Sequence, residues 1–88
     1  MATETQKRAL GIRQKQESLA ENCTGKNLED KINDADITST VREKMHEIRQ
    51  WCNKCIHNEI QGNQNAKATE YEDELKGKHK WSSKSKPK

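Results

Sequence analysis

The sequence is poor in the residues that build a large hydrophobic core. It has no Phe, two Trp and one Tyr, and only eleven of its 88 residues are Leu, Ile or Val. No apolar stretch approaches the roughly 20 residues that a transmembrane helix requires, so we expect no membrane span. A chain of this length forms at most one small domain. Because few large apolar side chains can be buried, we expect a partner protein, self-association or a metal ion to contribute to its stability.

Sequence signatures of catalysis are also missing. The chain has only four glycines and no glycine-rich phosphate loop, and its Ser, His and Asp residues form no pattern typical of a catalytic triad. The acids in the segment 70–74 are typical of a solvated helix face rather than of paired catalytic carboxylates. We therefore expect a protein that is not an enzyme.

Cysteine usage and the polar N-terminal segment favour an intracellular protein. Three cysteines are an odd number, which argues against the closed disulfide framework of a small secreted domain. The first ten residues, MATETQKRAL, lack the hydrophobic region of a signal peptide. We accordingly expect a cytoplasmic protein or one associated with a nucleoid or nucleus.

The strongest periodic pattern predicts a long amphipathic helix over residues 40–61. Apolar residues recur there at steps of three and four, Thr40 and Glu43 are spaced as a capping box, and Gly62 follows as a stop. The apolar stripe of this helix is the candidate docking surface for a larger protein. The stripe also contains Cys52 and Cys55, and Trp51 lies beside it. The candidate interface residues are Val41, Met45, Ile48, Trp51, Ile56 and Ile60.

Weaker patterns predict the rest of a helical body over residues 1–76. Thr3 can cap a first helix over about 4–23, Asn27 can cap a short helix, and a further short helix is expected over 66–75. No alternating apolar pattern suggests a strand. The predicted fold is all-α, a small helical hairpin or an irregular three- to four-helix unit.

The segment WCNKCIH, residues 51–57, is the one local chemical signature in the sequence. Two cysteines three residues apart on a helix face the same way and can bind one zinc ion. However, free cysteines on an apolar stripe behave as small hydrophobic residues, so we expect Cys52 and Cys55 to be core thiols and no cofactor to be bound. The alternative is a zinc site with ligands drawn from Cys23, Cys52, Cys55 and His57.

The C-terminal residues 76–88 carry six lysines and no acid, whereas residues 1–75 have eleven Lys and Arg against fourteen Asp and Glu. A flexible basic segment is attracted to nucleic acid through counterion release. We therefore expect a disordered tail over 77–88, in which Trp81 stacks on a base or fills a pocket of a partner. The candidate nucleic-acid contacts are Lys76, Lys78, Lys80, Trp81, Lys84, Lys86 and Lys88.

These features predict a non-catalytic accessory or regulatory protein. Its helical body would dock on a larger protein, as part of a nucleic-acid-handling complex, and its tail would add nonspecific electrostatic contact. The alternative is a direct nucleic-acid-binding protein, stabilised by zinc, in which the tail forms one surface with Arg42, Arg49 and Lys54. A third interpretation, self-assembly through a helix–helix seam, would account for the thin core but not for the tail.

Overall fold

A computed structural model of the chain describes residues 3–57 and 64–84. Within these ranges the chain forms four helices and no strand, which confirms the predicted all-α fold. The helices are α1 (Glu4–Leu19), α2 (Leu28–Asp34), α3 (Ser39–Ile56) and α4 (Asn65–Leu75). None of the helices in the described ranges has the length and apolar character needed to cross a bilayer.

Local capping signals determine where the first two helices begin. Thr3 and Gln6 form the capping box at the start of α1: the Thr3 hydroxyl accepts from the Gln6 amide at 3.1 Å, and the Gln6 side chain accepts from the Thr3 amide at 2.8 Å. The Asn27 side chain accepts from the Asp30 amide at 2.9 Å and so caps α2 as predicted. Both caps lie within three residues of their partners, which is why the sequence alone indicates them.

The start of α3 differs from the prediction. Thr38, not Thr40, is the N-cap, and its hydroxyl accepts from the Val41 amide at 3.2 Å. Beginning the helix at Ser39 also adds a backbone hydrogen bond from the Arg42 amide to the Thr38 carbonyl oxygen at 2.9 Å. Two threonines two residues apart are both suitable caps, and the earlier one gives the longer helix.

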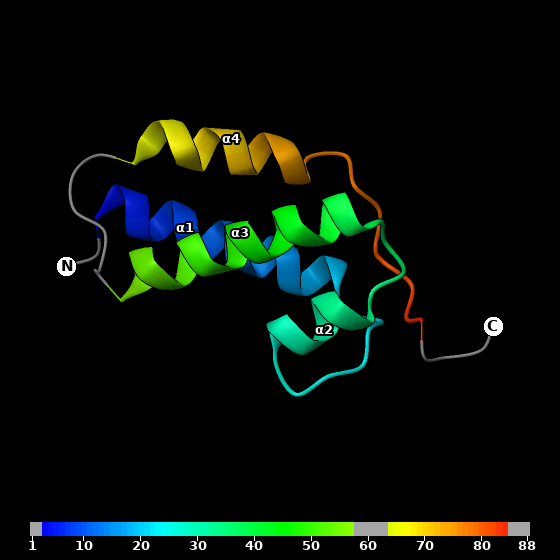
Figure 1. Ribbon diagram of the computed structural model, residues 1–88. Coiled ribbons are helices and arrows are strands. Elements are labelled where there is room, and N and C mark those ends of the chain that lie inside the picture. The colour runs from blue at the N-terminus through cyan, green and yellow to red at the C-terminus, as the bar shows by residue number, and fades with distance from the viewer. Residues whose placement is uncertain (1–2, 58–63, 85–88) are drawn as a thin grey trace.

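Helix α1 packs against two other helices. It contacts both α3 and α4, while α2 packs on α3. Figure 1 shows α1 and α4 running in the same direction and α3 running in the opposite one. Side-chain contacts agree with this arrangement, because Arg8 reaches Glu72 of α4 and Arg13 reaches Asn53 near the end of α3.

The core combines aliphatic, aromatic and sulfur-containing side chains. Trp51 and Tyr71 meet edge to face, with ring centroids 5.2 Å apart, and thereby join α3 to α4. One polar side chain, Gln16 of α1, is fully buried and donates to the Met45 carbonyl oxygen of α3 at 3.0 Å. The aromatic pair of Trp51 and Tyr71 therefore adds apolar area to a core that has few aliphatic residues.

The expected disorder of the tail is wrong for residues 77–84. This segment runs from the end of α4 past the start of α3 to the connection between α2 and α3 (Figure 1). Trp81 is only 7% exposed and belongs to the hydrophobic core. Its neighbours in sequence are polar, so the apolar surface that covers Trp81 comes from distant parts of the chain. That is why the local sequence did not indicate its burial. Residues 85–88, with Lys86 and Lys88, lie outside the described residues.

We call residues 78–84 the C-terminal strap. Three backbone hydrogen bonds of 2.8 Å tie it to the body: Trp81 N–H to the Leu19 carbonyl, Asp36 N–H to the Ser82 carbonyl, and Lys84 N–H to the Asp34 carbonyl. Lys80 also pairs with Glu21 at 2.6 Å, and this contact lowers the pKa of Glu21. Both of these side chains are exposed, so their ion pair contributes little compared with the burial of Trp81. The strap thus joins the end of α1 to the connection between α2 and α3.

Replacing Trp81 with Ala should lower the free energy of unfolding by about 3–5 kcal/mol, because it removes the side chain that anchors the strap. Urea denaturation followed by circular dichroism measures this change. The exposed His79 of the same strap provides the control, since His79→Ala should change stability by less than about 0.5 kcal/mol. Equal stability of the Trp81 variant and the original chain would show that the strap is not packed.

Candidate docking groove between α1 and α4

The apolar stripe of α3 does not form an open surface in the structure. Met45, Ile48 and Trp51 are buried in the protein's own core, and Val41 and Ile56 pack against it with partial exposure. Ile60, the last residue of the predicted docking stripe, lies outside the described residues. In this conformation the periodicity of α3 reflects packing within the chain, so Met45, Ile48 and Trp51 present no open surface to a partner.

The three cysteines, Cys23, Cys52 and Cys55, are all buried. Burial raises the pKa of Cys52 to about 12 and also raises that of Cys55, so both are protonated thiols near neutral pH. His57, the remaining zinc candidate, is exposed at the end of α3. Among residues 3–57 and 64–84, no group of three or more His, Cys, Asp or Glu side chains is placed to hold a metal ion.

The rate at which the Cys52 thiol is alkylated in the native protein tests its burial directly. A rise in pKa from 9.0 to about 12 reduces the thiolate fraction at pH 8 on the order of a thousandfold, and only the thiolate reacts with iodoacetamide. We expect Cys52 to be alkylated at least about a hundredfold more slowly in the native protein than in urea. Mass spectrometry can follow it separately, because trypsin cleaves after Lys54, between Cys52 and Cys55.

Similar alkylation rates for native and unfolded Cys52 would contradict the assignment as a core thiol. A measured content of one zinc ion per chain would favour the alternative zinc site instead.

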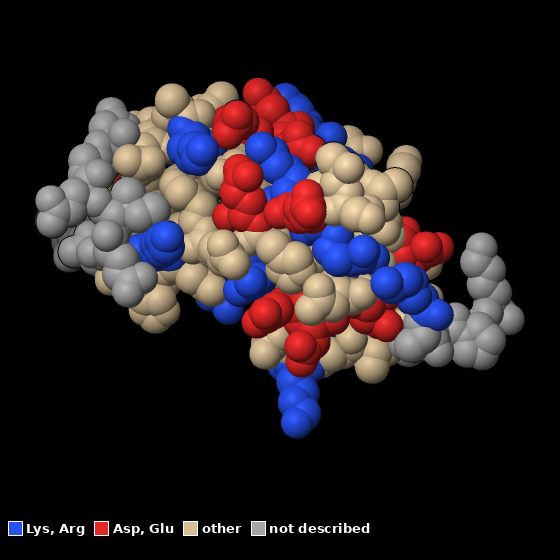
Figure 2. All heavy atoms as spheres, viewed as in Figure 1, with Lys and Arg blue, Asp and Glu red and all other residues tan. Residues whose placement is uncertain are grey.

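The lysines near the C-terminus remain available to solvent although the strap is ordered. Lys76, Lys80 and Lys84 are exposed, and Lys78 is half-buried. On the face shown in Figure 2, acidic and basic side chains are interleaved over the helices rather than separated into two regions. The structure therefore presents these lysines on a folded surface, beside carboxylates of the body.

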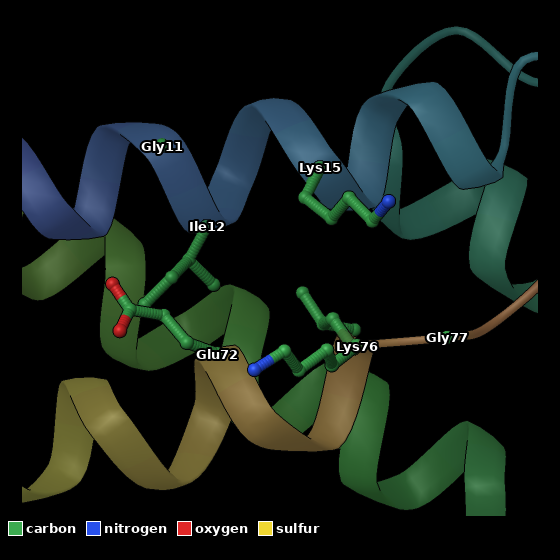
Figure 3. A pocket seen from close by; sticks show the side chains of 7 residues that line it. Gly11, Ile12, Lys15, Glu72, Lys76 and Gly77 are labelled. Atoms are coloured by element: carbon green, nitrogen blue, oxygen red, sulfur yellow. The ribbon is translucent and has the colours of Figure 1, made fainter.

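An open groove of about 320 Å³ lies between α1 and α4 (Figure 3). Side chains of α1 form one wall, and the last turn of α4 with the two residues after it forms the other. The lining residues are Gly11, Ile12, Lys15, Glu72, Leu75, Lys76 and Gly77.

The groove combines an apolar floor with a positive rim. Ile12 is 3% exposed and Leu75 is 1% exposed, so they form the floor, while Lys15 and Lys76 stand at the sides. Glu72 also lines the groove, but both of its carboxylate oxygens accept hydrogen bonds from Arg8, at 2.6 and 3.2 Å. Since Arg8 compensates this carboxylate and holds its pKa below the usual range, the lysines determine the charge of the rim.

Gly11 opens the wall of the groove on α1. A Cβ atom at this position would have no other group within 4 Å, and the backbone shows no positive φ there, so neither packing nor conformation requires glycine. Glycine inside a helix costs about 1 kcal/mol relative to alanine. The neighbouring Leu10 is 43% exposed, the only large hydrophobic side chain so exposed in the described part of the chain. We did not predict this site from the sequence. The one signal that could have indicated it is Gly11, an isolated glycine within a helical pattern.

Gly77 forms the opposite end of the groove for a different reason. Its φ of +76° lies in the left-handed region, which allows the chain to turn away after α4 and enter the strap. The same turn leaves Lys76 at the rim of the groove.

Comparisons with known proteins identify no relative. The chain matches no family model, no curated protein and no solved structure. A function therefore has to be inferred from the residues and the geometry of this chain.

Proposed function

We propose that the protein is a non-catalytic accessory or regulatory protein that docks on a larger protein through the groove between α1 and α4. The observation that carries this proposal is the combination of an apolar floor, a lysine rim and a glycine-opened wall in one groove. Such a concave apolar site with a few charged groups at its edge is typical of a binding surface.

Charge complementarity specifies the chemistry of the partner. Lys15 and Lys76 form no ion pair among the described residues, while the groove's only acid, Glu72, is already paired with Arg8. A partner segment with a large apolar side chain next to Asp or Glu would fill the floor and pair with the lysines. The methylene stems of both lysines can cover such an apolar side chain while their ammonium groups contact the carboxylate.

The basic C-terminal segment supports a partner that works on nucleic acid. Residues 76–88 contain six lysines, and Lys76, Lys80 and Lys84 are exposed in the described part of the chain. Exposed lysines can contact phosphates without sequence preference. In this proposal the groove provides specific docking on an intracellular complex and the lysines add electrostatic contact. In the alternative, direct nucleic-acid binding, these lysines would carry the main affinity and binding would weaken strongly with salt.

Filling the groove should abolish docking. Gly11→Gln places a side chain over the apolar floor and Lys15→Glu reverses one rim charge, so each should weaken binding to an acidic, apolar segment by at least about tenfold. Peptides selected from a random display library on the original chain provide the ligand. We expect them to combine Asp or Glu with a large apolar residue, and fluorescence polarisation gives their affinities.

Two controls make this experiment decisive. Gly11→Ala adds only a methyl group and should preserve binding, and Lys54→Glu changes an exposed lysine of α3 outside the groove. Selected peptides that bind the Gly11→Gln variant as tightly as the original chain would refute groove docking. A different outcome would be that the selected peptides are purely acidic and lose all binding to the chain at moderate salt. Binding would then be purely electrostatic, which favours the nucleic-acid alternative.

A further inference from the structure

A second hollow, of about 210 Å³, lies where α1, α2 and α3 meet. Its lining is polar apart from Leu28 and contains two arginines and one acid. The lining residues are Arg13, Asn27, Leu28, Glu29, Arg49 and Asn53. This hollow shares no residue with the groove between α1 and α4.

The two asparagines of this hollow have already used their acceptor oxygens. The Asn53 side-chain oxygen accepts from Arg13 Nη1 at 3.0 Å, and the Asn27 side-chain oxygen accepts from the Asp30 amide at 2.9 Å. What these two amides can still offer to a ligand is chiefly their NH₂ donors. With the two guanidinium groups, the polar lining is therefore rich in donors and poor in acceptors.

Arg49 is positioned by a neutral partner. Its Nε donates to His46 Nδ1 at 3.3 Å, and because an arginine can only donate, Nδ1 must be the acceptor. The proton of the neutral ring then lies on His46 Nε2, which donates to the Asn33 side-chain oxygen at 2.8 Å. Burial and the nearby Arg49 lower the pKa of His46, in agreement with a neutral ring. Arg49 is thus oriented without being neutralised.

Acidic neighbours do not fully compensate the two arginines. Arg13 contacts Glu17 only at 3.7 Å through exposed side chains, and Arg49 forms no ion pair within the described residues. Glu29 is exposed and, over the same part of the chain, pairs with neither arginine. The lining itself contains two arginines and one acid, and the two planar guanidinium groups can each bind an oxyanion through paired N–H donors.

We infer that this hollow binds a tetrahedral oxyanion of the phosphate class. Arg13 and Arg49 would contact its oxygens from α1 and α3, and the amide groups of Asn27 and Asn53 would donate further hydrogen bonds. A backbone phosphate of nucleic acid and free phosphate share this chemistry. The site is independent of the groove, so it stands whether or not the groove docks a partner protein.

Amide shifts in NMR spectra of the ¹⁵N-labelled full chain provide the test. The protein is titrated with inorganic phosphate in one arm and with a short single-stranded oligonucleotide in the other, at an ionic strength held constant with chloride. We expect saturable shifts centred on the amides of Asn27, Glu29 and Asn53. Saturation by phosphate alone would identify the free ion as the ligand, and tighter saturation by the oligonucleotide would identify the nucleic-acid backbone; either result supports the inference.

Four variants separate a built site from general charge attraction. Arg49→Gln should weaken binding by at least about tenfold, and Arg49→Lys should also weaken it, because lysine keeps the charge but lacks the fork. Lys7→Gln removes an exposed charge near the start of α1, outside the hollow, and should change affinity by less than about twofold. Glu29→Gln should strengthen binding by about threefold, since it removes the one acid of the lining.

The gain from Glu29→Gln keeps the test valid even if the Arg49 variants unfold, because a surface substitution that tightens binding cannot act through loss of structure. No saturable shift at the hollow in either arm would overturn the inference. Equal losses from Arg49→Gln and Lys7→Gln would also overturn it and would assign the effect to nonspecific charge.

Discussion

The burial of Trp81 is the contact on which the rest of the structure depends. A chain with eleven Leu, Ile and Val residues and no Phe has little apolar area to spare, so each aromatic side chain matters. Trp51 and Tyr71 join α3 to α4, and Trp81 closes the core from the C-terminal side. Its burial brings the backbone of the strap within hydrogen-bonding distance of Leu19 and of the connection after α2. Part of the basic C-terminal segment is therefore a structural element as well as a carrier of positive charge.

This use of the apolar residues explains where binding surfaces remain. The apolar side chains of α3 are packed into the protein's own core. The candidate recognition features on the described surface are therefore two hollows with charged residues at their edges. The groove between α1 and α4 has an apolar floor under lysines and suits an acidic, apolar peptide segment. The hollow at Arg13 and Arg49 is polar and donor-rich and suits an oxyanion. As proposed, the groove would bind a protein partner and the hollow a phosphate-bearing ligand, so one small body would link the two.

The sequence predicted features that depend on neighbouring residues and missed those that depend on distant ones. The capping box at Thr3, the cap at Asn27 and the periodic stripe through Met45 and Ile48 follow from spacing within one helix, and the structure contains all three. The burial of Trp81 could not be predicted, because its own neighbours are polar and its contacts come from other parts of the chain. The groove was missed for the same reason, since Gly11 and Leu75 are far apart in sequence and meet only when α1 packs on α4.

Amide hydrogen exchange of Trp81 in the isolated chain at micromolar concentration tests the central claim most directly. The Trp81 N–H donates to the Leu19 carbonyl oxygen at 2.8 Å, and the Trp81 side chain is buried in the core. We therefore expect the amides of Trp81, Asp36 and Lys84 to exchange slowly. All three should show one common opening free energy, close to that of the core helices. Exchange of the Trp81 amide at the rate of an unstructured peptide, while the amides of α3 stay protected, would contradict the account.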